Sequence, residues 1–298
     1  MLIHPSGRFQ GLGDRWEAAI KQQFDRDHEN YVSPTAEQCR QLRDAVELTR
    51  GGHLEEARQT AGQVGYRVDQ IELEGEKFWL LEEAGPERGW GKVLLRQRPA
   101  SHWIVEVPHP VADKSTPELG LRAFQELDAQ AYILAGAHRN NRHDPSPDVA
   151  GRPISDMTHT RQTAFQAFHE GLTEPGQNVL QLHGFSAWKG HQEAPDFPLS
   201  RQVVLSDGAD DDRDPPRLKA LHQSLVDQGF DTSIVTFDSP GNSRLSAVTN
   251  VQRDQMEAAH LVPRSEFIHL EAETKLRTGE AREQNFERLL RGLKQALD

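Results

Sequence analysis

The feature that most constrains the fold is an alternation of short apolar stretches with helical patterns, which runs from residue 102 to the end of the chain. Each apolar stretch is rich in β-formers and is followed by turn residues. Strands that alternate with helices in this way form a mostly parallel sheet covered by helices on both faces. We therefore expect an α/β fold with a mostly parallel (mixed) sheet flanked by helices. The expected strands are His102–Val107, Ala131–Ala135, Asn178–Leu182, Gln202–Leu205, Thr232–Phe237 and Glu266–Leu270, and the expected helices are Pro117–Leu127, His159–Gly171, Pro216–Gln228 and Glu280–Leu297.

The chain before this region has a different pattern. Residues 1–65 look helical, with Trp16, Ile20 and Phe24 at helical spacing. A second helix is expected to start with Ser33 as N-cap and Pro34 at N1 and to stop at Gly51-Gly52, and a third to run from Leu54 to about Val64. Three short strands then follow, at Arg67–Leu73, Phe78–Glu82 and Lys92–Leu95. This change of pattern predicts a helical N-terminal segment over residues 1–65 and an α/β domain over residues 66–298.

Composition narrows the possible partners and the compartment. The 298 residues carry a formal net charge of -12, which argues against nucleic acid or an anionic membrane surface as partner. No apolar run approaches the roughly 20 residues that span a bilayer, and the N-terminus lacks the layout of a signal peptide. We expect a cytoplasmic protein, although a trimmed export signal would leave no trace. The single cysteine, Cys39, excludes an internal disulfide and a cysteine-rich metal site. The oligomeric state stays open.

Histidines follow three of the predicted strands. His109, His138 and His183 each come at or just after a strand end. Because the carboxyl ends of parallel strands meet at one edge of a sheet, these side chains are expected to lie near the active crevice. Two histidines with one carboxylate form a known catalytic zinc set, and Asp113 is close enough to His109 to complete it. Glu106 is a rival third ligand, although residues an odd number apart on a strand face opposite sides. The alternative is that each histidine is an ordinary surface residue.

Further polar residues stand near the same expected edge. Glu271 closes an apolar strand and could act as general base on a metal-bound water, or it could be a rim residue. Arg277 could pair with a substrate carboxylate or be an exposed helix arginine. Thr158 is a plausible N-cap of the helix expected from His159, and a helix N-terminus with nearby His and Arg suits anions.

Several other chemistries lack their motifs. The chain has no Gly-x-Ser-x-Gly elbow, no phosphate-binding Gly-Lys-Ser/Thr loop and no Gly-x-Gly-x-x-Gly after a strand. His169-Glu170 is not a metalloprotease motif, since position 173 is Thr. Cys39 lies far in sequence from the strand ends, which argues against a nucleophile. The acidic run 209–214 favours a solvated loop over a calcium site, because the EF-hand spacing is absent.

With these residues in place, the chain resembles the zinc carboxypeptidase-like superfamily, near the phage poly-gamma-glutamate hydrolases and the N-formylglutamate amidohydrolases. Pro108-His109 with Asp113 and Thr116 resembles the first-ligand segment. Leu182-His183-Gly184 resembles the strand that supplies the second histidine. The segments Asn250–Arg253, Ile268–Glu271 and Leu276-Arg277 resemble the region of the catalytic glutamate and a following arginine, and Met157–Phe165 a weaker intermediate segment.

The resemblance implies one zinc held by His109, Asp113 and His183, with Glu271 as base. It departs from the superfamily in having Asp where Glu is usual and in lacking the His-x-x-Glu spacing. The implied activity is zinc-dependent hydrolysis of an amide or peptide bond, and the implied substrate is a small molecule or peptide with a glutamate-like carboxylate. An esterase or deacylase on the same site and a non-catalytic binding protein are the alternatives. The candidate substrate contacts are His138, Arg139, His159 and Arg277, with Lys189 a weaker one.

Overall fold

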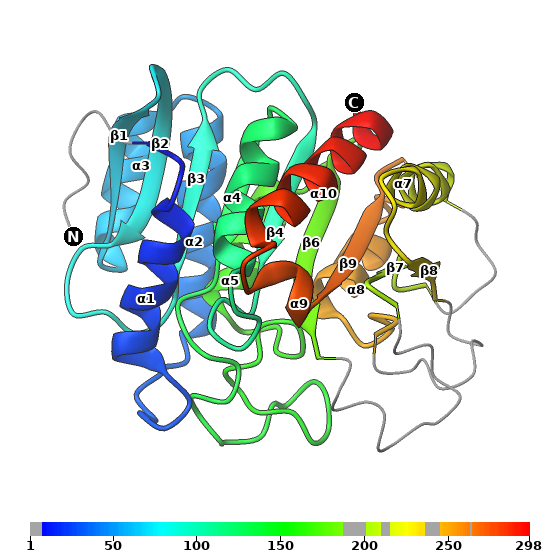
Figure 1. Ribbon diagram of the computed structural model, residues 1–298. Coiled ribbons are helices and arrows are strands. Elements are labelled where there is room, and N and C mark those ends of the chain that lie inside the picture. The colour runs from blue at the N-terminus through cyan, green and yellow to red at the C-terminus, as the bar shows by residue number, and fades with distance from the viewer. Residues whose placement is uncertain (1–7, 187–200, 210–214, 236–244, 263) are drawn as a thin grey trace.

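The structure is a computed structural model, and it describes residues 8–186, 201–209, 215–235, 245–262 and 264–298. Its centre is a nine-stranded mixed sheet with the order β1-β2-β3-β5-β4-β6-β9-β7-β8 (Figure 1). The strands are β1 Tyr66–Leu73, β2 Glu76–Glu83, β3 Lys92–Arg96, β4 Trp103–Val107, β5 Ala131–Leu134, β6 Asn178–Phe185, β7 Val203–Ser206, β8 Thr232–Ile234 and β9 Phe267–Glu273.

The middle of the sheet is parallel, β1–β3 form an antiparallel flank, and β7 and β8 form a parallel pair that runs against β9. Parallel pairing joins β5 to β4, β4 to β6 and β6 to β9, whereas β1, β2 and β3 pair antiparallel and β7 runs against β9. Every residue of β4, β5 and β9 is buried. Burial on both faces explains the nearly continuous apolar sequences of β4 and β5. In β9, His269, Glu271 and Glu273 alternate with apolar residues although every position is buried. The prediction of a mixed α/β sheet flanked by helices is confirmed.

Helices cover both faces of the sheet (Figure 1). One layer contains α1, α4, α7 and α10, in which α4 packs against α1 and α10, and α10 packs against α7. The other contains α2, α3, α5 and α8, in which α2 packs against α3 and α5. The helices are α1 Leu12–Phe24, α2 Ala36–Arg50, α3 Leu54–Gln63, α4 Thr116–Glu126, α5 Ala164–Leu172, α7 Pro216–Asp227, α8 Val251–Ala258, α9 Thr274–Arg277 and α10 Arg282–Leu297.

The N-terminal helices share one hydrophobic core with the sheet. Glu118 on α4 accepts hydrogen bonds from the backbone amides of Gly11 and Gly13, each at 2.9 Å, at the start of α1. A carboxylate in this position satisfies amides that have no partner within the helix. The boundary expected near residue 65 stays a prediction.

Several element boundaries differ from the sequence analysis. The N-cap of α2 is Thr35, which forms a capping box with Gln38, so the helix starts later than a Ser33 cap would place it. The helix expected from His159 begins at Ala164 with Thr163 as N-cap, because the residues before it form turns. Neither α8 nor α9 was expected.

The remaining differences concern strand ends and segments outside the described residues. β9 extends to Glu273, so Glu271 lies within the strand and not at its end. The strand expected over 232–237 ends at Ile234 as far as it is described. Lys189 and residues 210–214 of the acidic run lie outside the described residues. Among the described residues, no helix is long and apolar enough to cross a membrane.

Candidate metal centre

Two neighbouring parallel strands carry the two histidines to one edge of the sheet. β4 pairs with β6, so His109, two residues beyond β4, lies beside His183 near the end of β6. Asp113 is one turn further on, and its backbone amide donates to the His109 carbonyl at 2.9 Å. Side chains four residues apart on such a turn project to the same side. The turn therefore brings the carboxylate back to the histidines.

The three side chains form a nearly equilateral set of ligand atoms. His109 Nδ1 and His183 Nδ1 are 3.2 Å apart, and Asp113 Oδ2 lies 3.4 Å from each of them. Zinc bound at about 2.0–2.1 Å in tetrahedral geometry holds its ligand atoms about 3.3 Å apart. All three residues are buried. The spacing therefore fits one tetrahedral ion with a fourth position open.

The hydrogen bonds of the two rings also fit a metal. His109 Nε2 lies 2.9 Å from a carboxylate oxygen of Asp156, and His183 Nε2 lies 2.9 Å from the amide oxygen of Gln181. Both partner atoms are acceptors, so each Nε2 carries a proton and each Nδ1 is the nitrogen that faces the other ligand atoms. Burial lowers the pKa of His183 to about 4, which keeps that ring neutral. The two Nδ1 atoms and the carboxylate oxygen could together hold a cation.

A second group overlaps the first. His183, His269 and Glu271 also bring ligand atoms within 4.8 Å of one another. Glu271 pairs with His183 across β6 and β9, and His269 Nε2 lies 3.7 Å from Glu271 Oε1. In the described part of the chain, neither Glu271 Oε2 nor His269 Nδ1 has a hydrogen-bond partner. Because a buried polar atom without a partner costs free energy, these two atoms mark the place where a water or substrate would bind.

Glu271 has the electrostatics of a proton acceptor. Burial, and then the charge of Asp113, raise the pKa of Glu271 to about 8, while Arg277 and Arg139 act in the opposite direction. A carboxyl group with a pKa near neutral can both take up and release a proton at physiological pH.

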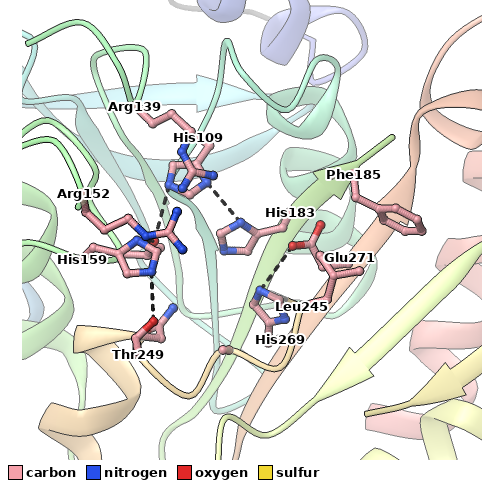
Figure 2. A pocket seen from close by; sticks show the side chains of 14 residues that line it. His109, Arg139, Arg152, His159, His183, Phe185, Leu245, Thr249, His269 and Glu271 are labelled. Atoms are coloured by element: carbon pink, nitrogen blue, oxygen red, sulfur yellow. Dashed lines mark hydrogen bonds and ion pairs between the residues drawn. The ribbon is translucent and has the colours of Figure 1, made fainter. Parts of the chain in front are cut away.

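These groups open into a cavity of about 400 Å³ (Figure 2). His109, His183, His269 and Glu271 line it, and Arg152 and His159 lie on the other side of the cavity from Glu271. Phe185 and Leu245 contribute apolar surface. The cavity is thus mainly polar next to the ligand atoms.

Two of the predicted substrate contacts line the cavity. Arg139 donates to Asp156 at 2.6 Å, and the charges of Asp156 and Asp113 outweigh burial and raise the pKa of Arg139. His159 Nδ1 lies 3.1 Å from Asp156 Oδ2, and its Nε2 lies 3.1 Å from Thr249 Oγ1. Asp156 therefore orients His109 and two cavity residues together.

The other two predicted contacts do not line the cavity. His138 Nδ1 accepts a hydrogen bond from the Asn140 amide at 2.9 Å. Arg277 donates to the backbone carbonyls of Ala272, at 2.9 Å, and Lys114. Its guanidinium packs on Gly184, where an added Cβ would meet Cζ at 2.2 Å. Arg277 therefore links the end of β9 to the turn that carries Asp113 by hydrogen bonds.

Glu106, the rival third ligand, is fully buried away from the other ligand atoms. Its carboxylate lies 2.6 Å from His169 Nδ1 and accepts a hydrogen bond from Gln181 Nε2 at 2.9 Å. The structure thus brings Asp113, and not Glu106, to the two histidines.

Four residues of this site were not predicted from the sequence. Asp156 and Gln181 contact His109 and His183, His269 belongs to the second ligand group, and Arg152 lines the cavity with no hydrogen bond or ion pair of its guanidinium among the described residues. Gln181 and His269 carried a local signal, because they stand two residues before His183 and Glu271 and so face the same side of their strands.

Comparisons with solved structures give distant likenesses. The N-formylglutamate amidohydrolase from Ralstonia eutropha JMP134 is 13% identical, with a TM-score of 0.47 over 68% of this chain and 93% of that one. A bacteriophage poly-gamma-glutamate hydrolase is 12% identical, with a TM-score of 0.44 over 72% and 90%. The zinc-free apo form of YNDL is 16% identical, with a TM-score of 0.42 over 69% and 90%.

No family model matches the chain, and no curated protein does. The solved structures include both kinds of protein that the sequence resembles. What the site can do chemically follows from its own geometry.

Proposed function

We propose that the protein is a zinc-dependent hydrolase that cleaves an amide or peptide bond. The observation that carries this proposal is the convergence of His109 Nδ1, His183 Nδ1 and Asp113 Oδ2 at 3.2–3.4 Å. Beside them lies Glu271, whose Oε2 has no hydrogen-bond partner among the described residues. A bound Zn²⁺ would supply Lewis acidity, which acidifies a water and polarises a carbonyl group.

Glu271 is the proton carrier in this proposal. Its free carboxylate oxygen takes the proton of the attacking water and later gives it to the departing nitrogen, so the amine leaves neutral. The pKa of about 8 supports both steps, since the same group must first accept and then donate.

Two arginines support a substrate that carries negative charge. Arg139 lines the cavity while held by Asp156, so its position suits the oxygen that becomes negative during attack. The guanidinium of Arg152 lines the cavity without a hydrogen bond or ion pair among the described residues and is suited to a substrate carboxylate. A small molecule or peptide with a glutamate-like carboxylate is the substrate class that we propose.

The electrostatics of Glu271 also support catalysis over binding alone. Its buried Oε2 has no hydrogen bond among the described residues, and its pKa of about 8 suits a group that must accept and then release a proton. An ester substrate would contact the same residues, so an esterase or deacylase is the alternative function. The experiment therefore compares amides with matching esters.

The test is hydrolysis of a panel of N-acyl glutamates, γ-glutamyl peptides and matching esters, with wild type and Glu271→Gln both loaded with zinc. We expect amide cleavage by the wild type and a loss of about 10²–10⁴-fold in kcat/KM for the variant at unchanged zinc content. Turnover of esters alone would replace the amidase with an esterase. Equal activity of Glu271→Gln and wild type would refute the role of Glu271.

A further inference from the structure

A chain of buried hydrogen bonds runs from helix α8 to the metal-ligand histidine His183. The side-chain oxygen of Asn250 caps α8 by accepting from the backbone amides of Gln252 and Arg253. With its oxygen so occupied, Asn250 must turn its amide nitrogen outward, and this nitrogen donates to Gln181 Oε1 at 2.6 Å. The cap of one helix thereby fixes which end of Gln181 faces it.

Glu106 fixes the other end of Gln181. A carboxylate only accepts, so the group that faces it must be the amide nitrogen of Gln181, at 2.9 Å. Glu106 is in turn held by His169, whose second ring nitrogen lies 3.2 Å from Gln255 Oε1. A flipped Gln181 would place its oxygen against the carboxylate and its nitrogen against another nitrogen.

The polarity of Gln181 decides the tautomer of His183. Among the described residues, Gln181 Oε1 is the hydrogen-bond partner of His183 Nε2, at 2.9 Å, so His183 carries its proton on Nε2 and presents Nδ1 to the other ligand atoms. Glu106, Gln181 and His169 are almost fully buried, and none of them lines the cavity. A buried carboxylate in that position has no use for packing, since an apolar side chain of similar volume would cost less.

We propose that Glu106 is a positioning residue of the metal centre, which acts through the amide of Gln181 to hold His183 in the metal-binding tautomer. This inference rests on the proposed function, because it needs a metal at the Nδ1 atoms. It predicts that metal affinity depends on two residues that touch neither metal nor substrate.

The experiment measures zinc affinity by competition with a chromophoric chelator, for wild type, Gln181→Met, Glu106→Met and Glu106→Gln. Loss of an outer partner of a histidine ligand weakens binding by about 10–100-fold, and we expect this for Gln181→Met and Glu106→Met. Glu106→Gln should stay near wild type, because its oxygen can still accept from Gln181 while His169 takes the other tautomer. The absorption bands of bound Co²⁺ should change in the two methionine variants only.

Gln130→Met is the matched control. Gln130 is buried just before β5, at the edge of the sheet away from the site, so the same substitution there should leave zinc affinity and the Co²⁺ bands unchanged. If Glu106→Met does not fold, Gln181→Met and Glu106→Gln decide the question.

The outcomes separate this inference from the proposed function. Unchanged affinity in both methionine variants, in a wild type that binds one zinc, would overturn the inference and leave the hydrolase standing. Equal losses in Glu106→Gln and Glu106→Met would overturn it too, because charge and not amide polarity would then be responsible. A wild type that takes up no metal would overturn both.

Discussion

At the residue scale, the central observation is that His109 Nδ1 and His183 Nδ1 lie 3.2 Å apart. The outer partners Asp156 and Gln181 both accept from Nε2, so each Nδ1 is the nitrogen that faces the other ligand atoms. Two histidines and one carboxylate are the donor set of known catalytic zinc sites.

At the same scale, Arg152 is expected to control substrate affinity. Replacing it with methionine removes the guanidinium charge, which has no partner among the described residues, and keeps an apolar side chain. We expect Arg152→Met to raise KM for a carboxylate substrate by about tenfold or more, in line with the 1.5–3 kcal/mol of a charged hydrogen bond, with a smaller effect on kcat.

Steady-state kinetics on the amide found in the panel would check this. Arg161→Met is the control, because Arg161 is half-exposed and pairs with Asp148 and Asp254 outside the cavity. The same rise in KM for both variants would show that Arg152 does not act in the cavity.

At the scale of elements, the packing of α1 on α4 links the N-terminal segment to the sheet. An added Cβ at Gly13 would lie 2.4 Å from the backbone of Glu118, whereas one at Gly62 on α3 would meet nothing within 4 Å. We expect Gly13→Ala to lower the free energy of unfolding by about 1–3 kcal/mol and Gly62→Ala to raise it by about 0.5–1 kcal/mol.

Urea unfolding of the two variants beside wild type measures both changes. The opposite signs are the important result, because they separate close backbone contact from helix propensity. A Gly13→Ala protein as stable as wild type would mean that α1 does not pack on α4 in this way.

Helices and strands could be predicted from the sequence where their buried residues are apolar. The strand ends that carry His109 and His183 could be predicted, because β4 and β6 are apolar runs bounded by turn residues. Helix α8 could not, because Gln252 and Arg253 on its buried side face a polar network, so no apolar period marks it. The predicted start of α5 at His159 was wrong because the residues before Thr163 form turns. These turns bring Asp156 to His109.

Contacts between residues distant in sequence could not be predicted. Asp156 is 47 residues from His109, and Glu106 is 75 residues from Gln181. Nothing in the local sequence pairs these residues with each other, since only the fold brings them together.

At the scale of the whole molecule, metal binding is expected to couple to folding. A ligand that binds only the folded state at a free concentration of 100 times its Kd adds about 2.7 kcal/mol of stability. We therefore expect zinc to raise the Tm and a chelator to lower it again, as followed by circular dichroism. His183→Ala is the control, and a Tm that responds to zinc equally in this variant would place the metal elsewhere.

The most direct test of a zinc site at His109, Asp113 and His183 is zinc stoichiometry by plasma mass spectrometry, on protein purified without a histidine tag. The variants are His109→Ala, Asp113→Ala, His183→Ala and His269→Gln. We predict one zinc per chain in wild type and in His269→Gln. His109→Ala, Asp113→Ala and His183→Ala should each lose the zinc while keeping the fold intact. Zinc lost in His269→Gln but kept in His109→Ala would move the metal to the His183, His269 and Glu271 group, and a folded wild type that takes up no zinc would contradict the metal centre itself.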